Sequence, residues 1–265
     1  MIGIGTTFAI AAAGAAGSTA LYGTFAPTSS LWGKVVWRAP DRSTPRVSVT
    51  FDDGPTPGCT DRVLDLLDVL GVKATFFVIG RNVQRCPDLL RRMDREGHLI
   101  ANHSFDHGHY DMFRGLTYWN RQVSRTDELI ESIIGKKPAL FRPAMGFTTF
   151  PIHHAARRGG HTVVTWSRRG RDGVHADASD IVRRIMRYGG PGDILMLHDG
   201  IDPHLARVRD RSATIDAIRP LVKALRERGL SAVRLDELLG IAGYSEPAAP
   251  CGRALPAASV ARTMK

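Results

Sequence analysis

The stretch RVSVTFDDGP, residues 46–55, is an apolar run of β-branched and aromatic residues that ends in two adjacent aspartates. Its alternating pattern predicts a buried strand, and the Gly-Pro that follows predicts a turn at the strand's end. Asp52 and Asp53 therefore stand where a core strand stops, and each carboxylate raises the cost of ionising the other. A bound divalent cation would remove this repulsion, because the ion would supply the largest local positive charge.

Short runs of the same kind alternate with segments of helical periodicity over residues 46–240. Strands are expected at 47–51, 74–79, 98–101, 139–142, 162–166, 193–197 and 231–234. Helices are expected near 61–70, 86–96, 118–134, 151–159, 179–188, 213–228 and 235–240. Such β/α units predict an α/β fold, a single (β/α)7-type distorted barrel of parallel strands with outer helices; a doubly wound sheet is the alternative.

The N-terminal segment differs from the rest of the chain. Residues 1–33 contain no charged side chain, and their first half is largely Ala, Gly and Ile. This is typical of a membrane anchor or an export signal, and residues 34–45 are expected to be a linker. The positive residues after it would keep an anchored domain cytoplasmic, whereas a signal would export it. We expect a membrane-associated or exported protein of the cell envelope, with the side of the membrane open, and a poorly ordered tail over 241–265.

The composition of the chain limits which kind of protein it can be and which partners it can bind. The chain has 265 residues with 43% hydrophobic content, enough for one α/β domain, and a formal net charge of +10. A basic surface favours anionic partners, but the arginines are scattered and no nucleic-acid motif accompanies them, so no nucleic-acid partner is expected. The three cysteines lack C-x-x-C spacing, which argues against a cysteine-bound zinc site.

Two histidines follow the third expected strand and offer ligands for the cation. His103 and His107 are four residues apart, so both imidazoles can reach one ion. Together with one aspartate they make a two-histidine, one-carboxylate site, which suits zinc and also iron or cobalt. The second aspartate is then free to take a proton from an attacking water.

Other polar residues follow other expected strands. Arg142 ends the fourth strand, Asp172 follows the fifth, and His198 ends the sixth. In parallel β/α folds the carboxyl ends of the strands meet at one rim, where active sites form. The sequence therefore predicts one site that combines carboxylates, imidazoles and a guanidinium.

At this point the chain resembles the polysaccharide deacetylases of the NodB-homology type, carbohydrate esterase family 4. The resemblance covers roughly residues 45–240 and rests on five motifs in the family's order. They are TFDDG at 50–54, HSFDH at 103–107, RPAMG at 142–146, WSRRGRDG at 166–173 and LMLH at 195–198.

The resemblance implies a role for each matching residue. Asp53, His103 and His107 hold the metal, Asp52 is the general base, Arg142 orients that base, His198 is the general acid, Asp172 supports its charged form, the Met145 N–H stabilises the oxyanion, and Leu195 lines the acetyl pocket. The implied cofactor is one divalent ion, Zn²⁺, with Co²⁺ or another transition metal as alternatives. The implied reaction is metal-dependent hydrolysis of N-acetyl groups from N-acetylglucosamine-type sugars in a peptidoglycan- or chitin-like polysaccharide.

The third and fourth motifs depart from the family pattern, and this keeps alternatives open. Arg169 stands where the family has Asp, Gly173 where it has Trp, and Met145 where it has Tyr. One alternative is a deacylase of a lipid-linked amino sugar at the membrane, so the expected partner is an amino-sugar polymer or a glycolipid. The other is a carbohydrate-binding pseudoenzyme, although Asp52 is intact.

The remaining histidines have no metal-type spacing. His109 is expected at the surface or behind the metal ligands. Surface positions are expected for His153, His154, His161, His175 and His204.

Overall fold

β1 (Arg46–Asp52), formed by the opening stretch, lies in the middle of a parallel sheet. The computed structural model describes residues 18–173, 177–202, 204 and 211–245. The other strands of the sheet are β2 (Thr75–Val78), β3 (Leu99–Asn102), β5 (Leu140–Phe141), β6 (Thr162–Val163), β7 (Arg168–Arg169), β8 (Ile194–His198) and β9 (Ser231–Ala232). Their order is β6-β5-β3-β2-β1-β8-β7, and β9 pairs with the start of β1.

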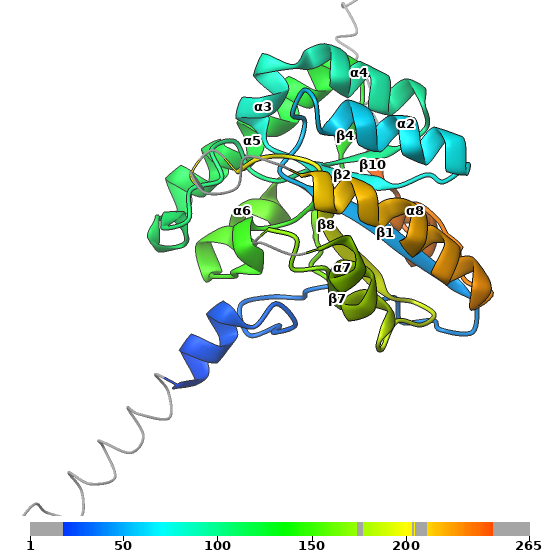
Figure 1. Ribbon diagram of the computed structural model, residues 1–265. Coiled ribbons are helices and arrows are strands. Elements are labelled where there is room, and N and C mark those ends of the chain that lie inside the picture. Colours follow the sequence, from blue (N-terminus) through cyan, green and yellow to red (C-terminus); the bar gives the residue numbers. More distant parts are fainter. Residues whose placement is uncertain (1–17, 174–176, 203, 205–210, 246–265) are drawn as a thin grey trace, which may run out of the picture.

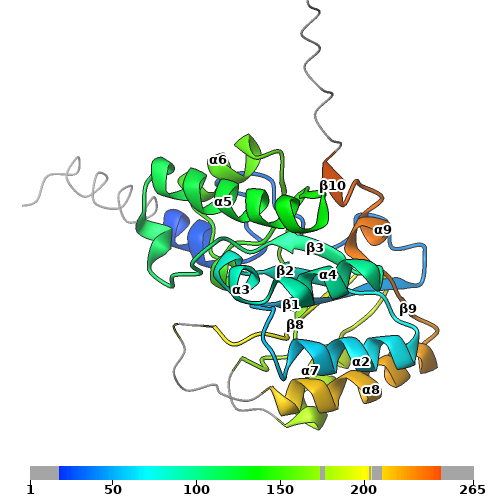
Figure 2. The ribbon, with the colours of Figure 1, turned by 90° about the horizontal axis from the view of Figure 1, so that it is seen from above.

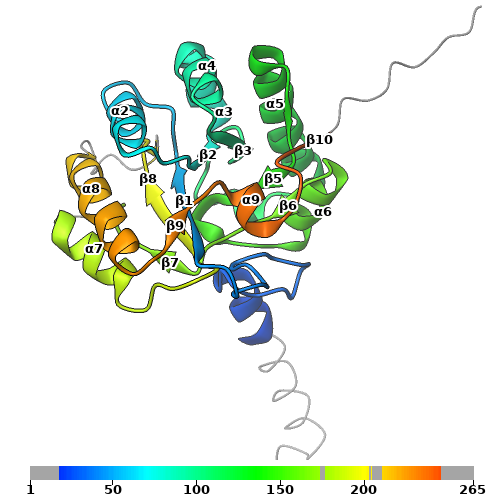
Figure 3. The same cartoon turned by 90° about the vertical axis from the view of Figure 1, so that its right-hand side faces the viewer.

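Helices cover the outside of this curled sheet (Figure 1). They are α2 (Thr60–Leu70), α3 (Gly80–Arg85), α4 (Pro87–Arg95), α5 (Leu116–Ile134), α6 (Phe150–Arg158), α7 (Ala178–Met186) and α8 (Ser212–Glu227). The short helix α9 (Leu235–Leu239) packs instead on the inner face, and there are two 3₁₀ turns, η1 (Asp111–Phe113) and η2 (Ala144–Gly146). From above, α5 and α6 lie on one side of the sheet and α2, α7 and α8 on the other (Figure 2). Figure 3 shows the helices in an arc around the strands. The expected parallel β/α architecture is confirmed. The helix expected over 86–96 is present as α4, which begins at Pro87. A second short helix, α3, which the sequence did not predict, ends just before it.

The central strands separate two apolar layers, since successive side chains of a strand point to opposite faces. Val49 and Phe51 pack in the outer layer, against α2, α7 and α8, together with Leu195 and Leu197 of β8. Met196 packs in the other layer, which the curled sheet encloses. The outer layer fixes the helices to the sheet, and the inner layer forms the floor below the strand ends.

One extended segment, residues 162–169, connects the two edges of the sheet. Its first residues pair with β5 and its last residues pair with β8. The first half of the expected linker, residues 34–40, lies beside this segment, and we call it the closing arm. Val36 forms a parallel bridge with Val164, and Arg38 forms an antiparallel bridge with the residue before β8. The closing arm is therefore paired with the domain through backbone hydrogen bonds.

The two ends of the chain lie largely outside the described residues. The anchor-like or signal-like character expected for 1–33 concerns mainly residues 1–17, which are outside; residues 18–25 are helical. Among the described residues no helix has both the length and the hydropathy needed to cross a bilayer. Of the expected tail, 246–265 are outside the described part, while β10 (Tyr244–Ser245) pairs with β4 (Lys137–Pro138).

Candidate active site

A cavity of about 350 Å³ lies at the carboxyl ends of the strands. Its lining residues are Asp52, Asp53, His103, His107, Met145, Trp166, Arg169, Arg171, Gly173, Met196, His198, Asp202 and Arg211. The cavity is within the size range of small-molecule sites in proteins, and its wall combines apolar side chains with converging charged groups. Six of the nine site residues expected from the sequence line it directly.

The three expected metal ligands surround one point. Asp53 Oδ1 lies 3.6 Å from His103 Nε2 and 3.4 Å from His107 Nε2, and all three residues are buried. Asp53 Oδ1 is buried and has no hydrogen-bond partner among the described residues. A buried carboxylate oxygen without a partner is costly, and a cation between it and the two imidazole nitrogens would satisfy it. The residues present therefore fit a divalent ion.

The other nitrogen of each imidazole faces a different acceptor. His103 Nδ1–H donates to the carbonyl oxygen of Arg142 at 2.7 Å. His107 Nδ1 lies 3.3 Å from Asp202 Oδ2. Groups of this kind behind a histidine ligand fix its ring and leave Nε2 to bind the metal. Asp202 was not predicted from the sequence.

Asp52 is held by a guanidinium instead of by the imidazoles. Arg142 Nη1 donates to Asp52 Oδ1 at 2.6 Å and to Thr50 Oγ1 at 2.8 Å, and its Nη2 donates to the Thr165 carbonyl at 2.9 Å. The Arg142 side chain is fully buried and lies over the Phe77 ring, 3.9 Å from its centroid. Asp52 Oδ1 is thereby paired with a buried cation, while Oδ2 remains on the side of the metal ligands.

His198 is paired with Asp172, as expected. His198 Nδ1–H donates to Asp172 Oδ1 at 2.9 Å, and Asp172 Oδ2 accepts from the His198 backbone N–H and from Thr214 Oγ1. Burial opposes a charge on the imidazole, but Asp172 and, further off, Asp53 outweigh it and raise the pKa of His198 to about 9. Arg211, which was not predicted, is buried beneath this pair and donates to the Asp172 carbonyl at 2.9 Å.

The backbone around the cavity is strained. Among the described residues, every non-glycine residue with positive φ lies in or next to the cavity: Asp53, Ser104, His107, Met145 and Arg171. This conformation is uncommon for residues with a Cβ and tends to occur at functional sites. At Met145, in η2, the φ of 57° belongs to the turn that borders the cavity. No sequence signal marks these positions.

The structure contradicts the expected role of Leu195. Its side chain is fully buried in the outer layer, away from the cavity, and the neighbouring Met196 lines the cavity instead. The reason is the two-residue period of β8, which places Met196 on the same face as His198. Counting two residues back from His198 would have identified Met196 from the sequence.

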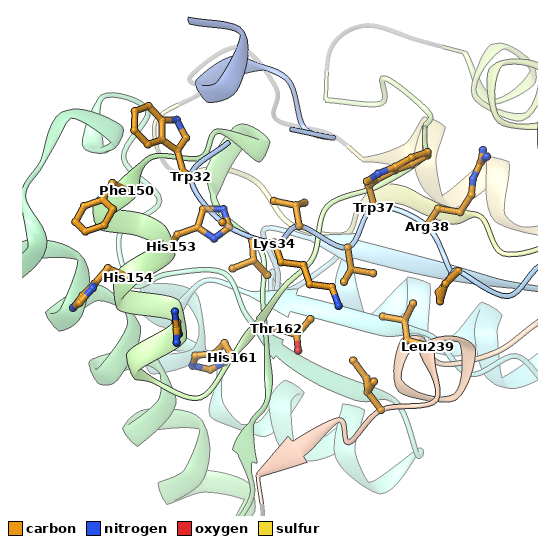
Figure 4. Close-up of a pocket in the computed structure, with 17 residues that line it drawn as sticks. Trp32, Lys34, Trp37, Arg38, Phe150, His153, His154, His161, Thr162 and Leu239 are labelled. Atoms are coloured by element: carbon orange, nitrogen blue, oxygen red, sulfur yellow. The ribbon is translucent and has the colours of Figure 1, made fainter. Parts of the chain in front are cut away.

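A second cavity, of about 670 Å³, lies between residues 32–40, α6 and the end of α9 (Figure 4). It shares no residue with the first cavity. His153 and His161 were expected at the surface, but both line this cavity and are buried. Gly33 lies against the His153 ring and Gly159 against the His161 ring. His161 Nε2 also bonds Asp127 Oδ2 at 2.8 Å.

His154, also expected at the surface, is exposed on α6 and borders this second cavity. His109 contacts Asp202 behind the metal ligands, and His204 is exposed. His175 is outside the described residues.

Comparison with known proteins gives a consistent set of relatives. The family model described as polysaccharide deacetylase matches residues 39–164. The chain is 34% identical to a peptidoglycan-N-acetylglucosamine deacetylase of Bacillus cereus, over 78% of this chain and 93% of that protein. It is 34% identical to a chitooligosaccharide deacetylase of Rhizobium leguminosarum bv. trifolii, over 70% and 87%. A solved peptidoglycan N-acetylglucosamine deacetylase superposes with a TM-score of 0.71 at 26% identity, over 79% of this chain and 94% of that chain.

The matches cover most of the length of each of these relatives. The parallel sheet, the metal-ligand cluster at its rim and these identities agree with one another. The chain belongs to the polysaccharide deacetylase family of metal-dependent carbohydrate esterases.

Proposed function

We propose that this protein removes N-acetyl groups from N-acetylglucosamine-type residues of a peptidoglycan- or chitin-like polysaccharide, with one zinc ion. The observation that carries the proposal is the pairing of two adjacent carboxylates with different partners. Asp53 faces His103 and His107, whereas Asp52 is held by Arg142. Such a division supplies a metal ligand and a base within one site. The names of the relatives support an amino-sugar polymer as substrate.

Zinc is proposed from the chemistry of the ligands. Two imidazole nitrogens and one carboxylate oxygen are common zinc ligands and leave positions open for water and substrate. Cobalt and other transition ions accept the same set. When bound, the ion would polarise the acetyl carbonyl and lower the pKa of a water molecule.

The chain's own groups complete the hydrolysis from both sides. Asp52 takes a proton from the attacking water, and Arg142 orients Asp52 through its hydrogen bond. On the other side, His198 donates a proton to the amide nitrogen as the C–N bond breaks, and acetate and a free amine are released. Asp172 keeps His198 in its charged form until this step. The Met145 N–H is proposed to bind the oxyanion, and Met196 is proposed to contact the acetyl methyl group.

Export or membrane association is also a proposal. It is supported by the absence of charged side chains in residues 1–33 and by two apolar side chains of this segment, Leu21 and Tyr22, which are mostly exposed. An amino-sugar polymer of the cell wall would be reached from such a location.

Two variants test the division of labour between the carboxylate and the imidazoles. Asp52→Asn is expected to retain the metal while kcat/KM falls roughly 10²–10⁴-fold, because only the base is lost. His103→Ala is expected to lose both metal and activity. Metal content by elemental analysis, beside the initial rate of acetate release, separates the two outcomes.

Thermal melting provides the control that both variants are folded. Equal metal loss in the two variants, or an active Asp52→Asn, would contradict the assigned roles.

A further inference from the structure

Two arginines line the active-site cavity without a counter-charge. Arg169 at the end of β7 and Arg171 just after it both border the cavity and are exposed. Among the residues that the structure describes, neither forms an ion pair with a carboxylate, whereas the adjacent Arg168 pairs with Asp193 at 3.1 Å. Burial and the charge of Arg171 both lower the pKa of Arg169, so the two guanidinium groups act on each other. An anion between them would relieve this repulsion.

Arg171 also has an unusual backbone conformation. Arg171 has a φ of 58°, and it shares the left-handed conformation with Asp53, His107 and Met145 in the same cavity wall. A strained residue in such a place persists when the surrounding structure requires it.

Next to the arginines, Gly173 leaves space beside the proposed general acid. A Cβ at this position would lie 3.5 Å from His198 Cε1, so a larger side chain would extend along that ring. The related motif has Trp here, and the glycine removes that wall. Among the described residues, the β7 side of the cavity therefore carries two guanidinium groups and no side chain at position 173.

We propose that Arg169 and Arg171 bind an anionic oxygen group, a carboxylate or a phosphate, carried by the reacting amino sugar or its immediate neighbour. This inference rests on the proposed deacetylase function and specifies its substrate class as an acidic amino sugar. Guanidinium groups bind carboxylate and phosphate through paired N–H donors, and an apolar cavity wall strengthens such contacts. A neutral chitin-like oligomer would leave both cations without a partner.

Kinetics on three substrates tests the proposal. The substrates are a neutral N-acetylglucosamine tetramer, a peptidoglycan fragment with lactyl carboxylates, and N-acetylglucosamine 1-phosphate. The wild-type protein is expected to have a higher kcat/KM for at least one acidic substrate than for the neutral one. Arg169→Gln and Arg171→Gln are expected to raise KM for it roughly tenfold, with kcat nearly unchanged and with no effect on the neutral substrate.

Arg62→Gln is the matched control, because Arg62 is exposed on α2 and the variant has the same net charge. It is expected to behave as wild type. The carboxylate and phosphate substrates identify which anion is the natural one.

Two kinds of failure are distinguishable. Efficient hydrolysis of the neutral substrate, with no effect of the arginine variants on any substrate, would overturn the inference and leave the deacetylase function intact. If none of the three substrates were hydrolysed, the deacetylase function would fail, and calorimetric titration with the same compounds would still test the arginines. Equal affinity of wild type and variants for the acidic compounds would then overturn the inference as well.

Discussion

Asp52 and Asp53 resolve the repulsion at the end of β1 by turning apart. Asp53 has a φ of 75°, so the chain enters a left-handed conformation directly after the extended Asp52. Asp52 then meets a guanidinium and Asp53 meets two imidazoles. Two adjacent identical residues thereby have different chemistry because the backbone changes direction between them.

The His198–Asp172 pair predicts how activity depends on pH. The pKa of His198 is raised to about 9 from an ordinary 6.5, so the acid form is present below pH 9 and activity falls as pH rises through it. In Asp172→Asn the charge that raises the pKa is lost, and the alkaline limb of kcat/KM is expected to move to lower pH. The pair's contribution to folding stability follows the same sign: it is complete below pH 6.5 and is lost as pH rises through about 9. An unchanged alkaline limb in the variant would exclude His198 as the general acid.

Substitution of Asp202 is expected to weaken metal binding although Asp202 is not itself a metal ligand. Asp202→Asn removes the charge behind His107 Nδ1, and ligand rings lacking such support bind metal roughly 10–100-fold more weakly. Metal titration with a chromophoric chelator measures the effect. Asp68→Asn, at an exposed position on α2, is the control. Equal metal affinity in the Asp202 variant and the control would show that Asp202 does not act on the metal site.

Strand β8 carries core residues on one face and cavity residues on the other. Substitutions of the neighbouring residues Leu195 and Met196 should therefore have different effects on stability and activity. Leu195→Ala is expected to lower the free energy of unfolding by about 2–5 kcal/mol, since it empties part of the outer layer. The remaining folded enzyme should keep its specific activity. Met196→Ala is expected to change KM and kcat, because Met196 borders the cavity. Urea unfolding beside steady-state kinetics checks both; the reverse pattern would mean that the faces of β8 are assigned wrongly.

The sequence predicted those strands and helices whose side chains follow one clear periodic pattern. The alternating pattern of β1 predicted the central strand. The polar residues at the strand ends predicted the metal-ligand cluster and the position of His198 at the same rim of the sheet. Asp202 escaped prediction because a loop carries it, and no periodicity tells where a loop side chain points. Leu195 was misplaced because the motif was matched by letters without applying the period of the strand that contains it. The left-handed residues escaped because their strain comes from tertiary contacts: a Cβ at Gly200 would lie 2.1 Å from the Asp53 carbonyl, so the loops after β1 and β8 pack without space for one.

Closure of the barrel depends on a segment that precedes β1. The closing arm, residues 34–40, forms one bridge with Val164, just after the edge strand β6, and another with Asp193, just before β8. Val35 and Ala39 of the arm are buried. Arg38 also pairs with the buried Asp193 at 2.7 Å. The arm therefore holds the segment from which Trp166 and the β7 arginines reach the cavity.

Two truncations test whether the closing arm is part of the domain. A chain that begins at residue 34 keeps the arm but loses the hydrogen bonds that Thr148 and Thr165 donate to the carbonyls of Gly23, Thr24 and Pro27. It is expected to unfold at a slightly lower urea concentration than the full chain. A chain that begins at residue 41 also exposes the apolar surface that Val35 and Ala39 cover, and it removes Arg38, one of the two arginines paired with Asp193. Its free energy of unfolding is expected to fall by roughly 2–5 kcal/mol. Its activity is expected to fall even under conditions where it stays folded, because the loosened segment 162–169 supplies one wall of the cavity. Equal stability of the two truncations would mean that the sheet closes without the arm and that residues 34–40 are a linker after all.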